Sequence, residues 1–150
     1  MNLCLLPNIA KWLAPMSEKS RIFWRYNMPA IIWAFLILLL CGFPGNKIPE
    51  LTFLEWLHPD KIAHLLIFGV QCFLLLKGFE KQTQYGFLNR NYISLALTIS
   101  VLYGCIVEVL QEYVFLHRSG DFRDTIANAI GAFLGLWIYR KYSTKVVNGY

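Results

Sequence analysis

Four long apolar stretches constrain the fold of this chain more than any other feature. Each is 15 or 16 residues long, and as a helix would measure roughly 24 Å. A hydrocarbon core is about 30 Å thick, so flanking residues must complete each span. The stretches are Met28 to Phe43, Ile62 to Leu76, Tyr92 to Val107 and Thr125 to Tyr139.

Composition favours a bilayer over water as the solvent for these stretches. Hydrophobic residues make up 57% of the 150 and charged residues only 15%, so whole segments lack the polar face of a soluble helix. Aromatic residues that suit the headgroup level lie at the ends of the stretches. We therefore predict an all-α, polytopic membrane protein built as a four-transmembrane-helix bundle.

The distribution of basic residues predicts the orientation. With four spans, ten of the 14 Lys and Arg residues fall on the side of the two termini and four on the other. The positive-inside rule places both termini in the cytoplasm and the protein, as a multi-pass protein, in the cytoplasmic membrane. We divide the chain into an N-terminal tail (1–27), a four-helix transmembrane domain (28–142) and a C-terminal tail (143–150).

Two other uses of these segments are disfavoured. The first apolar stretch follows basic residues and ends in "LLLC", but Leu40 stands where signal cleavage requires a small residue, so we expect an uncleaved helix. The four cysteines form no C-x-x-C pair and three lie in apolar stretches, which is typical of buried small hydrophobic residues. No nucleic-acid-binding motif is present, and we expect no nucleic-acid partner.

Polar residues from three predicted helices fall at one depth. Counting from the cytoplasmic end of each span at about 1.5 Å per residue, Glu108 and Asp124 lie roughly 24 Å up, His64 roughly 20 Å and Asn128 roughly 18 Å. Charged residues inside a span are tolerated when they face the bundle or a wet cleft. The sequence therefore predicts a polar pocket just below the outer surface.

The segment "PDKIAH" opens the second apolar stretch. Asp60 could cap the helix start, while Lys61 and His64 are three apart and share a face. These residues are pocket candidates. The simpler alternative is interfacial anchoring, with one histidine bonded to a neighbouring helix.

The segment "EVLQEYVFLHRSGDFRDTIAN" supplies the remaining candidates. Glu108 is expected to be paired or protonated at its depth, with Arg118 as its predicted partner or that of Asp124. Asp121 suits an N-cap and Asp124 the third helical position, so capping alone could explain Asp121. The pocket candidates from this segment are Glu108, Gln111, Arg118, Asp121, Asp124 and Asn128.

Small residues predict close helix contacts. Ala127, Gly131 and Gly135 repeat every four residues, and Gly104 lies on the face of Glu108 one turn below it. We expect these faces to pack within one protomer, with dimerisation as the alternative.

Together these residues resemble the VanZ-like family of small membrane proteins. The pattern is "DKIAH" at Asp60 to His64, followed by the polar residues and glycines of "EVLQEYVFLHRSGDFRDTIANAIGAFLG". It covers the start of the second stretch and roughly the second half of the chain, and residues 1–27 lie outside it. The resemblance implies a helical membrane protein. The family takes its name from a protein linked to teicoplanin resistance, and no reaction is attached to the family at large.

Three functions remain open. The first is an envelope protein whose outer pocket binds a lipid-linked or amphiphilic ligand, such as a membrane lipid or a lipoglycopeptide. The second is an intramembrane enzyme acting on a phosphate-bearing lipid, with His64, Glu108 and Asp124 as acid and base or as ligands of a divalent metal. The third is a structural subunit of a membrane complex. No recognised catalytic motif selects among them.

Overall fold

The computed structural model describes residues 17–42, 59–115 and 120–147. Within these ranges the regular structure is entirely helical, which confirms the predicted all-α class. The elements are α2 (Glu18–Cys41), α3 (Pro59–Glu80), α4 (Gly86–Arg90), α5 (Tyr92–Tyr113) and α6 (Phe122–Val147). The four long helices contain the four predicted apolar stretches, apart from Gly42, which follows the last residue of α2, and Phe43, which lies outside the described residues.

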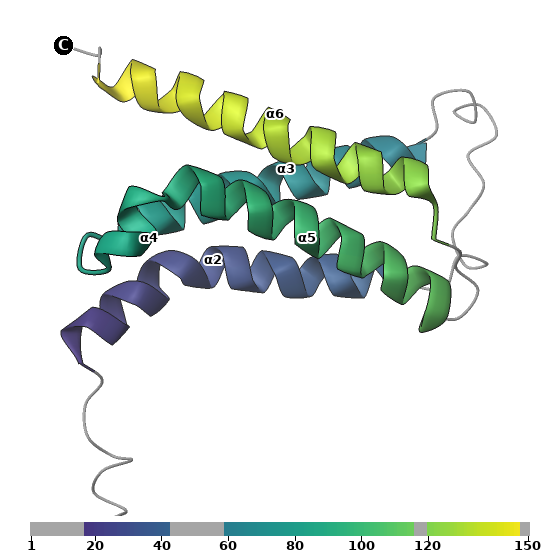
Figure 1. Cartoon of the computed structure of the whole chain (residues 1–150), viewed down its shortest axis with the longest axis horizontal. Helices are drawn as coiled ribbons and strands as arrows, with labels where there is room; N and C mark the ends of the chain where they lie inside the picture. The colour runs from purple at the N-terminus through teal and green to yellow at the C-terminus, as the bar shows by residue number, and fades with distance from the viewer. Residues whose placement is uncertain (1–16, 43–58, 116–119, 148–150) are drawn as a thin grey trace, which may run out of the picture.

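The long helices alternate in direction. Figure 1 shows the start of α2, the short helix α4 and the end of α6 at one end of the bundle. The end of α2, the start of α3, the end of α5 and the start of α6 lie at the other. Helix α3 contacts α2, α5 and α6. Residues near the start of α3 therefore face the end of α5 and the start of α6.

Three of the described helices are long and apolar enough to cross a membrane. They are Glu18–Cys41, Asp60–Glu80 and Tyr92–Tyr113. Helix α6 does not meet this measure although it has 26 residues, because Asp124 and Arg140 bound its apolar stretch. The outer surface of the bundle is rich in exposed large apolar side chains, including Phe35, Leu102 and Phe133. These features describe a membrane protein.

Helix α2 begins earlier than the predicted domain boundary at residue 28. The Ser17 side chain accepts a hydrogen bond from the Ser20 N–H at 3.2 Å and so caps the helix start. The predicted tail of residues 1–27 therefore includes the first turns of this helix. Further along, Trp33 Nε1 donates to the Ile67 carbonyl at 2.9 Å and ties α2 to α3.

Helices α3 and α6 touch through their backbones, and two of the small residues predicted to pack lie at this contact within the chain. A Cβ atom on Gly131 would overlap the Leu65 carbonyl oxygen, and one on Gly135 would overlap that of Gly69. A Cβ on Gly69 would in turn lie 3.1 Å from the Gly131 carbonyl oxygen. The small residues are therefore required by close approach of two helices.

The buried apolar core confirms the expectation for two cysteines. Cys72 is fully buried among side chains of α3, α5 and α6, and Cys41 is buried with Phe68 and Val107 nearer the other end. Cys105 is half-buried, and Cys4 lies outside the described residues. The thiols at positions 41 and 72 pack as small hydrophobic groups.

The glycine contact predicts the effect of a larger residue. Gly135→Leu should destabilise the bundle by about 1 to 3 kcal/mol, because the new side chain meets the α3 backbone, which cannot move aside cheaply. Thermal unfolding of the purified protein in detergent measures this. Gly86→Ala is the matched control, since a Cβ on Gly86 meets nothing within 4 Å. Equal melting temperatures for both variants would contradict the α3 and α6 contact.

Candidate functional site

Three helices bring polar side chains together where α3 begins. Helix α3 supplies three residues, α5 supplies one, and the start of α6 with its cap supplies three. We call this set the polar cluster; its members are Asp60, Lys61, His64, Glu108, Asp121, Asp124 and Asn128. The structure brings together His64, Glu108, Asp124 and Asn128, the four residues that the sequence places at one depth, while their role as a pocket stays a prediction.

Lys61 joins α3 to the start of α6. Its Nζ lies 2.9 Å from Asp124 Oδ1 and 3.1 Å from Asp121 Oδ2. The Asp124 side chain is only 7% exposed, whereas those of Lys61 and Asp121 are 28% and 44% exposed. The ammonium therefore supplies the positive charge that a buried carboxylate requires.

His64 is buried and its orientation is fixed by Asn128. The Asn128 Nδ2 group donates to Glu108 Oε1 at 3.2 Å, so its other amide atom, Oδ1, faces His64 Nδ1 at 3.0 Å as an acceptor. His64 Nδ1 must then carry the proton and donate. Glu108 Oε1 is also close to Nδ1, at 3.5 Å. Both acceptors therefore favour the tautomer that carries its proton on Nδ1.

Glu108 is held from three directions. Besides His64 and Asn128, the backbone N–H of Asp121 donates to Glu108 Oε2 at 3.3 Å. The carboxylate is buried, and these contacts supply the partners that it needs there. The predicted partner Arg118 lies outside the described residues, so that pairing stays a prediction. Among the described residues, His64 is the partner of Glu108, and Lys61 is the partner of Asp124.

Asp121 caps α6, as the sequence predicts. Its Oδ1 accepts a hydrogen bond from the Arg123 N–H at 2.9 Å, and Asp124 occupies the third helical position. The Arg123 N–H, followed by the side chain of Lys61, lowers the pKa of the Asp121 carboxyl below its ordinary value. Asp121 is therefore ionised at neutral pH.

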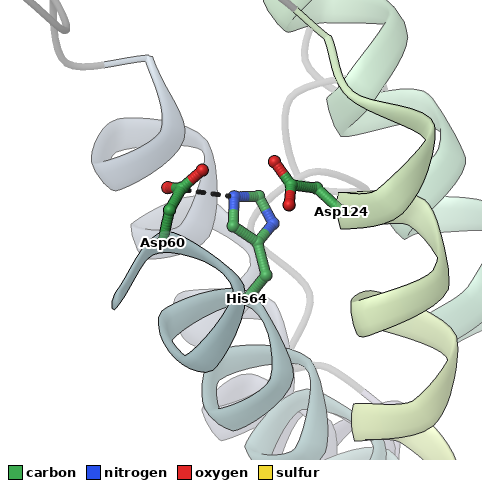
Figure 2. A group of neighbouring side chains, drawn as sticks. All are labelled: Asp60, His64 and Asp124. Carbon is green, nitrogen blue, oxygen red and sulfur yellow. Dashed lines mark ion pairs between the residues drawn. The ribbon is translucent and has the colours of Figure 1, made fainter. Parts of the chain in front are cut away.

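Asp60 lies in the first turn of α3, one residue after the helix begins at Pro59. Its Oδ1 is 3.9 Å from His64 Nε2, the ring nitrogen that Asn128 leaves free. One imidazole nitrogen of His64 and one oxygen each of Asp60 and Asp124 lie within 4.8 Å of one another. Figure 2 shows the imidazole between the two carboxylates. Of the predicted metal candidates, His64 and Asp124 belong to this group, with Asp60 in place of Glu108.

Gln111, a predicted pocket residue, joins two helices and lies outside the polar cluster, while Gly104 lies at a helix contact. Gln111 donates through Nε2 to the Cys41 carbonyl at 3.1 Å and joins the end of α5 to the end of α2. Gly104 allows α6 to approach, since a Cβ there would lie 2.9 Å from the Asn128 Cβ. Ala127, beside Asn128, is buried.

Sequence reasoning missed Gln71. This α3 residue is 3% exposed and lies two turns beyond His64 on the same face. Its Oε1 has no hydrogen-bond partner among the atoms that the structure describes. The signal was available, because Gln71 is a polar residue inside the apolar run "IFGVQCFLLL".

An all-helical membrane protein with a polar cluster between three helices is the class that these features define. The family model described as VanZ/LLP1 matches residues 15–145. The chain belongs to this family, which confirms the resemblance found in the sequence and extends it to α2. No curated protein and no solved structure matches significantly.

The hydrogen bonds of Asn128 predict a stability effect. Asn128→Ala should cost about 1 to 3 kcal/mol, because buried groups of His64 and Glu108 each lose a partner. Ile130→Ala is the control, since Ile130 is exposed on the same helix. Thermal unfolding in detergent compares the two. A loss no larger for Asn128→Ala than for Ile130→Ala would argue against the network.

Proposed function

We propose that all four long helices span the cytoplasmic membrane with both termini in the cytoplasm. The alternating directions in Figure 1 support an even number of crossings. Helix α6 is long enough, at 26 residues, and its polar first turn packs against α3. The excess of Lys and Arg on the side of the termini supports the orientation. The polar cluster then lies at the outer face.

Cysteine labelling tests this topology. In a variant with the four native cysteines replaced, an impermeant thiol reagent added outside intact cells should label Lys47→Cys and Ser119→Cys. Gln84→Cys should be labelled only after the cells are opened. Outside labelling of Gln84→Cys, with none at position 47, would reverse the orientation.

For function, we propose that the polar cluster binds the headgroup of an amphiphilic, lipid-linked ligand of the cell envelope. The observation that carries this proposal is the division of the cluster into two layers. Asp60, Lys61 and Asp121 are partly exposed, while the groups beneath them are buried and hydrogen-bonded. A rigid buried layer with an accessible rim is the arrangement that a binding site needs.

An apolar groove between α3 and α6 supports an amphiphilic ligand. It is lined by Leu65, Gly69 and Phe73 of α3 with Gly135 and Ile138 of α6. Lys61 lies four residues before Leu65, so the groove begins one turn below the rim on the same face of α3. A ligand could place a hydrocarbon chain in the groove and its headgroup at Lys61.

The family resemblance suggests one biological use. A site of this kind would serve resistance to a lipoglycopeptide such as teicoplanin, either by binding the drug or by binding the envelope lipid that the drug engages. This role rests on the family, and the geometry supports only the amphiphilic character of the ligand.

Catalysis on a phosphate-bearing lipid is the second candidate. The observation that favours it is the fixed orientation of His64, whose Nε2 faces the exposed Asp60. A buried imidazole held in one tautomer is suited to proton transfer. Release of phosphate from such a lipid, lost in His64→Gln, would distinguish this function from binding alone.

Substitutions in the cluster test the binding proposal. Protein in nanodiscs should bind teicoplanin or a polyprenyl phosphate, and Glu108→Gln and Asp124→Asn should each weaken binding roughly tenfold or more because charged hydrogen bonds are lost. Arg118, the predicted partner outside the described residues, is tested by Arg118→Lys, which keeps the charge but loses the planar guanidinium and should weaken binding as well. Glu112→Gln is the control, since Glu112 bonds only Gly120 N–H among the described contacts.

Abundance must be measured alongside binding in these variants. If the three substitutions retain wild-type binding, abundance and teicoplanin susceptibility in an expressing host, the polar cluster is not the functional site. Parallel loss of abundance and phenotype would instead support the structural subunit.

A further inference from the structure

Three potential metal ligands, two buried and one exposed, meet in the polar cluster. They are His64 and Asp60, one turn apart on α3, and Asp124 at the start of α6. Their ligand atoms lie within 4.8 Å of one another, and Figure 2 shows the side chains turned toward a common space. Carboxylate oxygens with one imidazole nitrogen form a set that binds zinc or manganese.

The second observation is the orientation of a buried histidine, which turns Nε2 toward Asp60. The His64 side chain is 4% exposed, and its Nδ1 proton is donated toward Asn128 and Glu108. In the neutral ring Nε2 therefore carries a lone pair. It faces Asp60 Oδ1 at 3.9 Å, which is longer than a hydrogen bond. Histidines that bind metals are oriented in this way, with the second nitrogen donating to an acceptor.

Charge also favours a cation. Near the three ligands lie the carboxylates of Asp60, Asp121 and Asp124, the ammonium of Lys61 and the guanidinium of Arg123, which acts on Asp121. Lys61 Nζ contacts Asp124 Oδ1, so the lysine and a metal would compete for the same carboxylate. The carboxylates outnumber the cations by one after Lys61 and Arg123 are counted, which favours binding of a cation.

We propose that Asp60, His64 through Nε2, and Asp124 bind one divalent transition metal ion, of which zinc is the best match. Three protein ligands leave at least one coordination position for a ligand atom from the outer side, as in open zinc sites. A headgroup phosphate could take that position despite the surrounding carboxylates. This use of the ion rests on the proposed headgroup binding, whereas metal binding itself does not.

Metal binding requires the ligand atoms to move closer together, and one of them belongs to an accessible side chain. Ligand atoms around a four-coordinate zinc ion are about 3.4 Å apart, given bond lengths of about 2.1 Å. The three atoms must therefore move closer than their 4.8 Å limit. The Asp60 side chain is 55% exposed and can rotate toward the site.

Metal titration of the full-length protein tests the proposal. Purified protein in detergent, stripped with a chelator, is titrated with Zn²⁺ against a competing dye and with Co²⁺ by visible absorption. We expect one ion per chain and an intense cobalt spectrum typical of low coordination number. Asp60→Asn and His64→Gln should weaken binding roughly tenfold or more, and Glu108→Gln roughly 10- to 100-fold through the orientation of His64.

Lys61→Met separates a metal site from a purely structural network. Removing the competing ammonium should tighten zinc binding, whereas a structural role would only destabilise the protein. Glu112→Gln should leave the affinity unchanged. If the variants of buried residues fail to fold, Asp60→Asn still tests metal binding, because the Asp60 side chain is exposed and its substitution should leave the fold intact.

Two results would overturn the inference. One is the absence of stoichiometric binding by the wild type. The other is equal affinity in wild type and Asp60→Asn, which would indicate an adventitious ion only. No lipid is present in this titration, so its failure leaves the headgroup proposal standing. Conversely, a protein that binds zinc but no amphiphile would retain the metal site and lose the headgroup proposal.

Discussion

The backbone contact between α3 and α6 determines where the charged groups meet. Helices commonly pack with their axes about 8 to 10 Å apart, a distance set by the side chains between them. Gly131 and Gly135 remove those side chains at Leu65 and Gly69. The short side chains of Asp124 and Asn128 can then reach Lys61 and His64 across the interface. The electrostatics of the site thus follow from a steric property of two glycines.

The same contact explains why α6 is less apolar than the other long helices. A polar residue in a bilayer carries a large free-energy cost only when it faces lipid or lacks hydrogen-bond partners. Asp124 and Asn128 are buried against α3 and α5, where Lys61, His64 and Glu108 satisfy them. Average hydropathy counts these residues without regard to the face that they occupy. A helix whose polar face is buried inside the bundle can therefore have a low mean hydropathy and still expose Ile130 and Phe133 on its outer face.

How far the sequence predicts the structure depends on what helical geometry specifies. Spacing along a helix gives the depth and face of each residue, so the common layer and the small face of α6 could be predicted. Spacing does not give the rotation of one helix relative to another. The contacts of Lys61 with Asp124 and of His64 with Asn128 could therefore not be predicted. Gly69 was missed for the same reason, since its role exists only opposite Gly131.

The cluster combines groups that solvent can reach with groups that it cannot. His64, Glu108 and Asn128 exchange hydrogen bonds with one another, and changing one alters the partners available to the others. Asp60, Lys61 and Asp121 have part of their surface free and can exchange partners at lower cost. Lys61 connects the two layers, because one of its carboxylates is buried and the other is exposed. An incoming cation or headgroup that displaces Lys61 from Asp124 would therefore change the charge felt by the buried layer without entering it.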